Sequence, residues 1–251
     1  MTEYCQGLNC TSTALIRSHI VPRGFARLAQ GDGKIIAIDP DRAPAVAKYP
    51  HGFFDRSILC GACDGHLGHF DEYAVEFCGT LLEKQKPYSD LGFEVPGVNT
   101  DFLRKGILAT LWRASISKLP ACSHVSLGSY ERKARDVLFG AISLSQFPQF
   151  PIVVQQYAAP FARSMDFYTL PHRTKFDGLN VYLFGLVGLR ILVKLDARPF
   201  PPVMREWVIG DEPHVRGTNI SFDETSEGRA LLDIAKTHRG YRSGKRNKAR
   251  L

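Results

Sequence analysis

Hydrophobic residues recur every three or four positions in several stretches of the chain, a spacing typical of amphipathic helices. In the stretch that follows Cys63, four residues keep this spacing: Phe70, Tyr73, Ala74 and Phe77. Asp64 lies where the first turn of this helix would place a carboxylate against the positive end of the helix dipole. The pattern therefore predicts a helix that begins at the second cysteine pair. Residues 102–116 and 129–144 predict two further helices, and residues 226–236 a short last one.

Beyond Pro148 the pattern changes to short runs that are rich in β-branched and aromatic residues and are separated by turn formers. The runs cover residues 151–157, 165–170, 180–188 and 189–195. They predict a mostly antiparallel sheet of about four strands, with Gly185 and Gly188 at a bulge or hairpin turn. Nearer the N-terminus, a short strand that ends at residues 19–22 and another at residues 34–38 are expected. The chain is thus predicted to be an α+β protein.

With 251 residues, 44% of them hydrophobic and 23% charged, the chain can bury a full core. The longest apolar run, residues 181–189, ends at Arg190 and is too short to cross a bilayer. The first residues have neither a basic start nor an apolar run, so they do not resemble a signal peptide. We therefore expect a protein of the cytoplasm that has no membrane-spanning segment.

The formal net charge of +7 is carried by the end of the chain. Residues 236–251 contain seven Lys or Arg and no Asp or Glu, so the preceding residues are neutral overall. This tail has too few apolar groups to fold alone. It can serve as a phosphate-binding arm, with Tyr241 stacking on a base, or as a solubilising terminus.

Four of the six cysteines form two closely spaced pairs, Cys5 with Cys10 and Cys60 with Cys63. Two such pairs supply the four soft ligands that a structural zinc ion needs. Disulfides are the alternative, but the cysteines are sparse and no signal peptide is expected. Cys78 and Cys122 are expected to be small buried side chains.

A short strand, a loop, a second strand and a helix that begins at the second cysteine pair make a zinc treble clef. This order resembles the HNH, or His-Me finger, nuclease core. The segment Ser18-His19-Ile20-Val21-Pro22 is similar to the Asp-His-Ile-x-Pro segment of zinc-bearing members, with a serine in place of the aspartate. Asp55 stands where these members commonly have an asparagine, and Asp64 where they commonly have a histidine.

The chain resembles still more a group of uncharacterised bacterial HNH-like proteins. The shared pattern has a Ser-His-Ile-x-Pro segment and then Gly-x-x-Asp-x-x-x-Leu-Cys-x-x-Cys followed by Asp or Glu. An acidic residue seven positions further on and a downstream Trp-Arg pair complete it. In this sequence its later positions are Gly52, Asp55, Leu59, Cys60, Cys63, Asp64, Asp71, Trp112 and Arg113. The similarity ends near residues 127–135. It implies a zinc treble clef and, less directly, a nuclease.

Phosphodiester cleavage needs a base that activates water and a divalent cation that neutralises developing negative charge. His19 is the candidate base, because a neutral histidine can take up a proton near pH 7. Mg²⁺ or Mn²⁺ prefers oxygen ligands, which Asp55 and Asp64 could supply, with Asp71 on the same helical face. Ser18 is a weak substitute for the aspartate that this site usually contains.

Each of these residues also has a structural interpretation. His19 can orient the zinc site by donating to a backbone carbonyl, or can itself be a zinc ligand. Asp64 can cap its helix, and Asp71 can belong to a solvated helical face.

The leading hypothesis is a metal-dependent nuclease that acts on DNA or RNA, with His19, Asp55 and Asp64 as catalytic residues. The alternative is a non-catalytic zinc-binding module that binds nucleic acid or a protein. In either case, the expected phosphate contacts are Arg17, Arg23, Arg242, Lys245, Arg246 and Lys248. We expect an HNH-like zinc module in residues 1–86, a helical connector and β-rich region in residues 87–236, and a flexible basic tail in residues 237–251.

Overall fold

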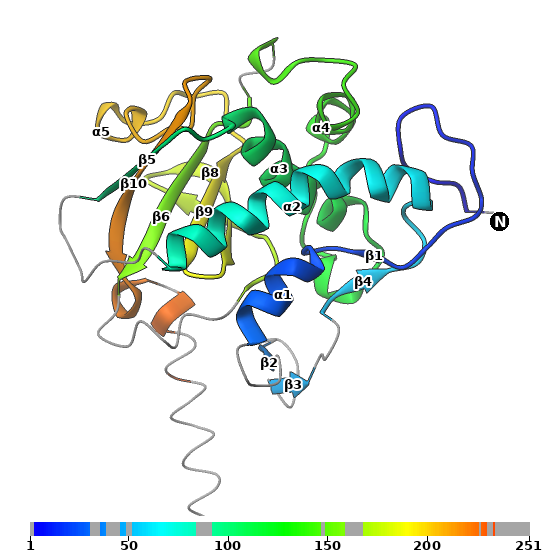
Figure 1. Ribbon diagram of the computed structural model, residues 1–251, viewed down its shortest axis with the longest axis horizontal. Helices are drawn as coiled ribbons and strands as arrows, with labels where there is room; N and C mark the ends of the chain where they lie inside the picture. The colour runs from blue at the N-terminus through cyan, green and yellow to red at the C-terminus, as the bar shows by residue number, and fades with distance from the viewer. Residues whose placement is uncertain are drawn as a thin grey trace, which may run out of the picture.

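The computed structural model describes residues 3–30, 36–38, 46–48, 52–83, 92–146, 149–158, 168–225, 227–229 and 233. Its elements are mixed α and β, and its main sheet is mostly antiparallel, which confirms the predicted class. Figure 1 shows the sheet at one end of the molecule and the N-terminal segment at the other. The helix α2 (Gly61–Glu83) runs between them.

The helices follow the predicted periodicity closely. Besides α2, the chain forms α3 (Thr100–Ile116) and α4 (Tyr130–Leu138), where the spacing predicts helices. Asn99 caps α3, because its side-chain oxygen accepts a hydrogen bond from the backbone N–H of Phe102 at 3.1 Å. Helix α4 ends before residue 144, since Gly140 adopts a φ of 77°, and residues 144–146 form a separate 3₁₀ turn.

Two short helices were not predicted, α1 (Arg23–Gln30) and α5 (Pro202–Arg205). Further 3₁₀ turns cover Pro120–Cys122 and Phe222–Glu224. Of the last predicted helix, residues 227–229 and 233 are helical, and the remainder lies outside the described residues.

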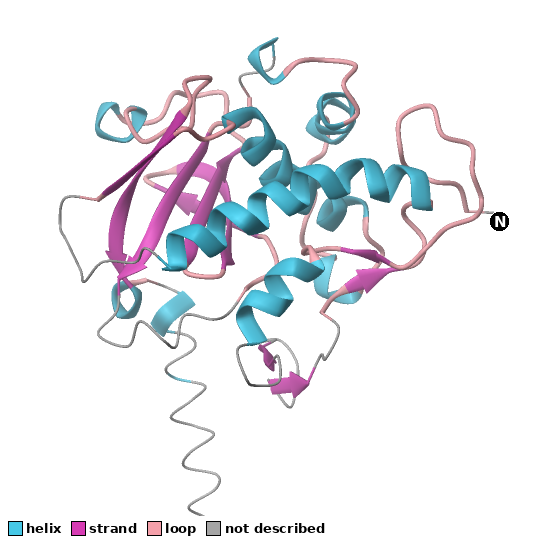
Figure 2. Ribbon diagram, in the orientation of Figure 1, coloured by secondary structure: helices cyan, strands magenta, loops and turns pink. Residues whose placement is uncertain are grey.

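The main sheet has six strands in the order β5-β10-β6-β9-β8-β7. Figure 2 colours the strands of the molecule magenta. The strands are β5 (Phe93–Pro96), β6 (Ile152–Ala158), β7 (His172–Phe176), β8 (Leu179–Leu186), β9 (Leu189–Lys194) and β10 (His214–Ser221). Only the β10–β6 pair is parallel among these described pairs. The runs at β6, β8 and β9 were predicted. Of the predicted run at 165–170, residues 168–170 are described, and Tyr168 forms a β-bridge to Leu186.

The central strands of the sheet, β6, β9 and β8, are buried on both faces. Successive side chains of β6 point to opposite faces of the sheet, as they do in any strand. Ile152 and Val154 belong to the large core shared with α2 and α3, whereas Val153 belongs to a smaller cluster with Phe200. Met204 and Trp207, in and after α5, cover that smaller cluster. This double burial explains why β8 and β9 are apolar along nearly their whole length.

Helices α2 and α3 cross in close contact at Gly106. A Cβ atom at this position would lie 2.5 Å from the backbone oxygen of Phe70. The large hydrophobic core extends from Cys5 to Val215 and so continues across the predicted boundary at residue 86.

The N-terminal part contains two small antiparallel pairs. β1 (Ser18–His19) pairs with β4 (Phe54–Asp55), and β2 (Ile36–Ile38) pairs with β3 (Val46–Lys48). Strand β2 matches the expected strand at residues 34–38 within the part that is described. Among the described residues, no helix is both long enough and apolar enough to span a membrane.

Candidate metal centre

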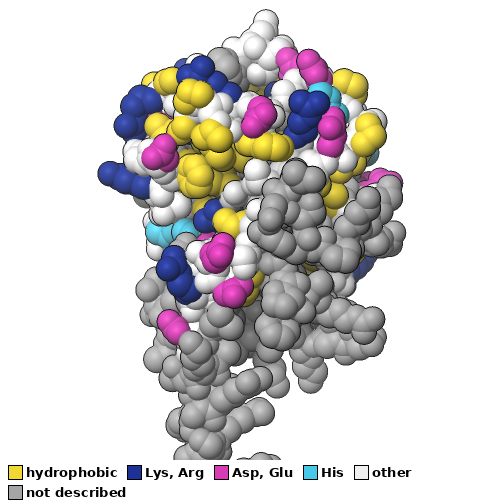
Figure 3. Space-filling model, turned by 90° about the vertical axis from the view of Figure 1, so that its left-hand side faces the viewer, with side chains coloured by type: hydrophobic (Ala, Val, Ile, Leu, Met, Phe, Trp, Pro, Cys, Tyr) yellow, Lys and Arg dark blue, Asp and Glu magenta, His cyan; other side chains and the backbone are white. Residues whose placement is uncertain are grey.

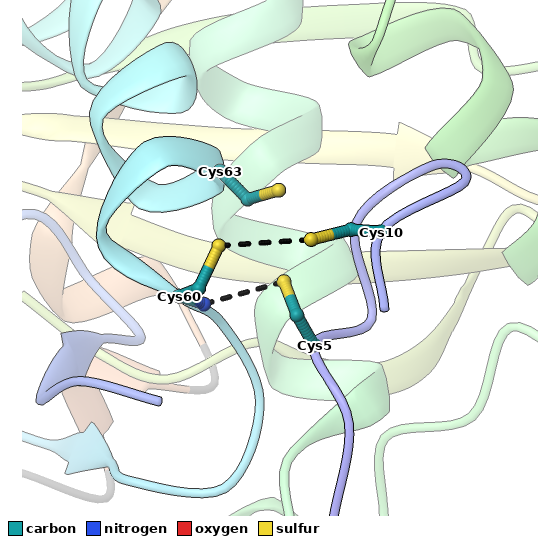
Figure 4. A group of neighbouring side chains, drawn as sticks. All are labelled: Cys5, Cys10, Cys60 and Cys63. Atoms are coloured by element: carbon teal, nitrogen blue, oxygen red, sulfur yellow. Dashed lines mark hydrogen bonds between the residues drawn. The ribbon is translucent and has the colours of Figure 1, made fainter. Parts of the chain in front are cut away.

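The two cysteine pairs meet at one point beside the first turn of α2. Cys5 and Cys10 come from the N-terminal loop, Cys60 directly precedes α2, and Cys63 lies in its first turn. All four Sγ atoms lie within 4.8 Å of one another, and those of Cys10 and Cys60 are 3.7 Å apart. In Figure 4 the four side chains point toward a common centre. Four cysteines so arranged could hold a metal ion such as zinc.

The backbone of the N-terminal loop shapes this centre. Asn9 adopts a φ of 53°, which turns the chain so that Cys10 returns toward Cys5. Gly7 has no room for a side chain, because a Cβ atom would lie 2.3 Å from the Cys63 Sγ. The backbone N–H groups of Gly7 and Cys60 donate to the Cys5 Sγ, at 3.4 and 3.2 Å. Such N–H donors stabilise the negative charge of a thiolate.

The pKa values of the thiols also fit a cation at this centre. A hydrogen bond from the backbone N–H of Cys63 lowers the pKa of Cys60 to about 7. Burial raises the pKa of Cys5 and of Cys63. Without a metal, Cys60 therefore ionises more readily than an ordinary cysteine, whereas Cys5 and Cys63 resist ionisation. A divalent cation removes this conflict, since each thiolate becomes its ligand.

Cys78 and Cys122 lie apart from the centre. Their exposed fractions are 2% and 1%, which confirms that they are buried side chains. Burial raises the pKa of both thiols, that of Cys122 to about 11. They are therefore expected to remain protonated and unreactive.

The strand β1 divides the predicted catalytic residues between two faces. Ser18 pairs with Asp55, and His19 pairs with Phe54, in the antiparallel register of β1 and β4. Directly opposed residues share a face of such a pair, while neighbours along one strand point to opposite faces. Ser18 and Asp55 are therefore on the buried side, and His19 is on the other side with Phe54.

On the buried side, the Ser18 hydroxyl donates a short hydrogen bond to Asp64. Ser18 is completely buried, and Asp64 lies in the first turn of α2, as the sequence predicts. This contact joins β1 to the start of the helix, one residue after Cys63.

Asp55 is held by four hydrogen bonds. One carboxylate oxygen accepts from the backbone N–H and the hydroxyl of Ser57, at 2.8 and 2.7 Å. The other accepts from the hydroxyl of Ser117 at 2.8 Å and the backbone N–H of Lys118 at 2.9 Å. Burial by itself would raise the pKa of Asp55, but these hydrogen bonds outweigh it and lower the pKa. Asp55 thus ties β4 to the end of α3.

Replacing Asp55 by Asn is expected to lower the free energy of unfolding at neutral pH by about 1–3 kcal/mol. The reason is that some of the hydrogen-bond donors around Asp55 lose their carboxylate acceptor. The contribution of the carboxylate is fully present above its pKa in the unfolded chain, about 3.9. It is lost as the pH falls through the lower pKa of the folded state. Urea unfolding at several pH values measures both effects, and an acid dependence that is the same in Asp55→Asn as in the wild type would contradict the assignment.

Asp71 forms a buried ion pair with Arg113 of α3. Both guanidinium Nη atoms donate to the carboxylate at 2.7 Å, and the exposed fractions of the two side chains are 13% and 2%. Burial alone would lower the pKa of Arg113, but the charge of Asp71 raises it. The interpretation of Asp71 as a solvated residue is therefore wrong, because its carboxylate clamps α2 to α3.

His19 and Arg17 lie on the same side of the β1–β4 pair as Phe54. The centroids of the His19 and Phe54 rings are 6.2 Å apart, and the Arg17 guanidinium lies 3.5 Å above the Phe54 ring centroid. Within the described residues, the four cysteines form the only group of three or more potential metal ligands that lie this close together. His19, Asp55 and Asp64 do not make a second such group there.

The remaining predicted phosphate contacts are only partly described. Arg23 is exposed at the start of α1. Arg242, Lys245, Arg246 and Lys248 lie outside the described residues.

Sequence reasoning missed the partners that hold these residues in place. Ser117 is 62 residues from Asp55, and Arg113 is 42 residues from Asp71. No local pattern links such positions, although the shared Trp-Arg pair of the resemblance marked Arg113 as a residue of interest.

Comparisons of the chain with protein-family models, with curated proteins and with solved structures find no match.

Proposed function

We propose that the chain binds one zinc ion through Cys5, Cys10, Cys60 and Cys63, and that the resulting HNH-like treble clef binds nucleic acid without cleaving it. The observation that carries the proposal is the position of the acidic residues. Their carboxylates are bonded to other parts of the fold, and the candidate base lies on the opposite face of β1.

The arrangement around the cysteines supports a treble clef. A loop carries the first pair, β1 and β4 form an antiparallel strand pair, and α2 begins at the second pair. Four thiolates favour zinc over hard cations such as Mg²⁺ or Ca²⁺, which prefer oxygen ligands. Zinc would supply structural cross-linking between the N-terminal loop and α2.

The hydrogen bonding supports a non-catalytic role. A hydrolytic site needs a base and a cation that converge on one phosphate. Both oxygens of Asp55 already accept two hydrogen bonds each, and Asp71 is bound at both oxygens by Arg113. Hydrogen-bond donors of the protein therefore occupy the positions around Asp55 and Asp71 at which a hard cation would have to bind.

The distribution of charge supports a nucleic-acid partner. The excess positive charge of the chain is concentrated in residues 236–251. A polyanion gains affinity from such a segment through the release of condensed counterions. Arg17 and Arg23 add basic groups beside the zinc-supported strand and at the start of α1.

A metal-dependent nuclease that acts on DNA or RNA is the second candidate. It is favoured by the contact between Ser18 and Asp64, because this contact brings the strand that carries His19 against the start of α2. In this candidate, Asp64 would exchange its hydrogen bond for Mg²⁺ or Mn²⁺, and His19 would activate water.

One experiment separates the two candidates. Plasmid DNA and a structured RNA are incubated with the zinc-loaded protein and Mg²⁺ or Mn²⁺, in parallel with His19→Ala and Asp64→Asn. We expect no cleavage above the level of the two variants, together with retained binding of the same DNA or RNA in a mobility-shift assay. Cleavage by the wild type that both variants lose would contradict the non-catalytic proposal and establish the nuclease.

A further inference from the structure

Arg17 is a half-buried arginine without a carboxylate partner. Its guanidinium lies 3.5 Å above the Phe54 ring, and its Nε atom is buried and lacks a hydrogen-bond acceptor. Within the described part of the chain, no Asp or Glu lies within ion-pair distance of it. A buried N–H donor is unfavourable unless a hydrogen-bond acceptor compensates for the lost water.

Two arginines that are more deeply buried than Arg17 show how this fold compensates such a charge. Arg113 is paired with Asp71. Arg190 donates from Nε to Glu227 at 2.6 Å and from Nη1 to Gln155 at 2.8 Å. Among the described residues, the cation–π contact with Phe54 is the only interaction of the Arg17 guanidinium. The acceptor that is missing here is therefore expected to come from a bound molecule.

The surroundings hold Arg17 in place. The preceding residues are fixed to the metal centre, because Ile16 donates to the backbone oxygen of Leu59 at 2.9 Å and Leu15 forms a β-bridge with Cys60. Phe54 is fixed opposite His19 by the β1–β4 register. The guanidinium is thus presented by a zinc-supported strand pair, with an imidazole on the same face.

We propose that the Arg17–Phe54 stack is an anion site that binds a phosphate of the nucleic-acid backbone. This inference rests on the proposed function and names the contact through which it acts. A guanidinium can donate two parallel hydrogen bonds to phosphate, and stacking on an aromatic ring fixes its plane in advance.

The opposite end of the molecule is less suited to a polyanion. Figure 3 looks onto the side that carries β5, β10 and α5. Over its coloured part, Lys and Arg side chains alternate with Asp and Glu and with hydrophobic groups. Arg216 and Arg198 are paired there with Glu94 and Asp196. A phosphate would have to compete with these carboxylates, whereas at Arg17 no such competitor is described.

The test measures how the affinity of the zinc-loaded full chain for short fluorescent DNA depends on salt concentration. Single-stranded and duplex DNA are both used. Arg17→Ala is expected to weaken binding about ten-fold, which is the loss of one charge-assisted contact. The slope of log affinity against log salt should become shallower by about 0.7–0.9. Arg17→Lys should keep the slope but bind more weakly, because an ammonium group cannot make the paired contact.

Arg132→Ala is the matched control, since it removes an arginine from α4 whose side chain is 82% exposed. Zinc content and circular dichroism confirm that each variant is folded. If the wild type binds DNA and Arg17→Ala changes affinity and slope no more than Arg132→Ala does, the assignment of Arg17 is wrong and the proposed function stands. If the wild type binds neither DNA form nor the structured RNA of the cleavage assay, both are wrong. Polyglutamate that competes as well as DNA at equal charge would instead indicate an acidic protein partner.

Discussion

Loss of the metal is expected to lower the melting temperature by about 8–16 °C. At a free zinc concentration about 1,000 times its Kd, a bound ion stabilises the folded state by about 4 kcal/mol. For a chain of this size, each kcal/mol corresponds to about 2–4 °C. The effect should be large because Cys5 and Cys60 are each only 5% exposed and belong to the continuous hydrophobic core. Four thiols left there without a cation would leave the N-terminal loop without its main attachment to α2.

Two measurements check this prediction. Elemental analysis should find one zinc ion per wild-type chain and none in Cys60→Ser. Thermal unfolding of Cys60→Ser, and of the wild type with a chelator, should show the same lowered melting temperature. Cys78→Ala is the matched control, because it removes a buried thiol outside the centre and should keep the zinc. A wild-type protein that contains no metal, or that a chelator leaves equally stable, would overturn the metal centre.

Breaking the ion pair between Asp71 and Arg113 should have an effect of similar size. Removing one partner leaves the other charge buried and unpaired, which costs about 3–5 kcal/mol. We therefore expect Asp71→Leu and Arg113→Met each to lower the free energy of unfolding by that amount. The double variant should lose less than the sum of the two, because it leaves no unpaired charge in the α2–α3 interface.

Urea unfolding with all three variants gives the coupling energy directly. Arg132→Ala, on the exposed side of α4, should change the free energy of unfolding by no more than about 0.5 kcal/mol. Single variants that are as stable as the wild type, or effects that simply add, would show that the pair does not hold the two helices together.

The resemblance to HNH-like proteins marked residues that the structure uses to join its parts. Asp64 bonds to β1, Asp55 to the end of α3, and Asp71 to Arg113 within α3. Gly52 adopts a φ of 69°, and a Cβ atom there would lie 2.8 Å from the Tyr168 hydroxyl. These contacts indicate that residues which the resemblance connected with catalysis stabilise the fold. Whether His19 acts in catalysis stays a prediction for the cleavage assay.

Several features of this protein could be read from its sequence because they depend on neighbouring residues. The two cysteine pairs are local, and their meeting at one centre was correctly predicted. Helices α2 and α3 follow from hydrophobic residues that recur every three or four positions, about once per helical turn. β8 and β9 follow from apolar runs that only a sheet buried on both faces accommodates. By contrast, β5 and β10 are short or weakly alternating, and they become strands because they pair with each other and β10 with β6.

The tertiary structure alone decided what each polar side chain touches. Asp55, Asp64 and Asp71 look alike in the sequence as acidic residues near a metal motif. Their roles differ because each of them has a partner that is 42 to 63 residues away along the chain. The opposite directions of Ser18 and His19 likewise appear only once the register of β1 and β4 is known. A hydrogen bond or an ion pair depends on distances of a few ångström, and such distances between remote residues are set by how helices and strands pack.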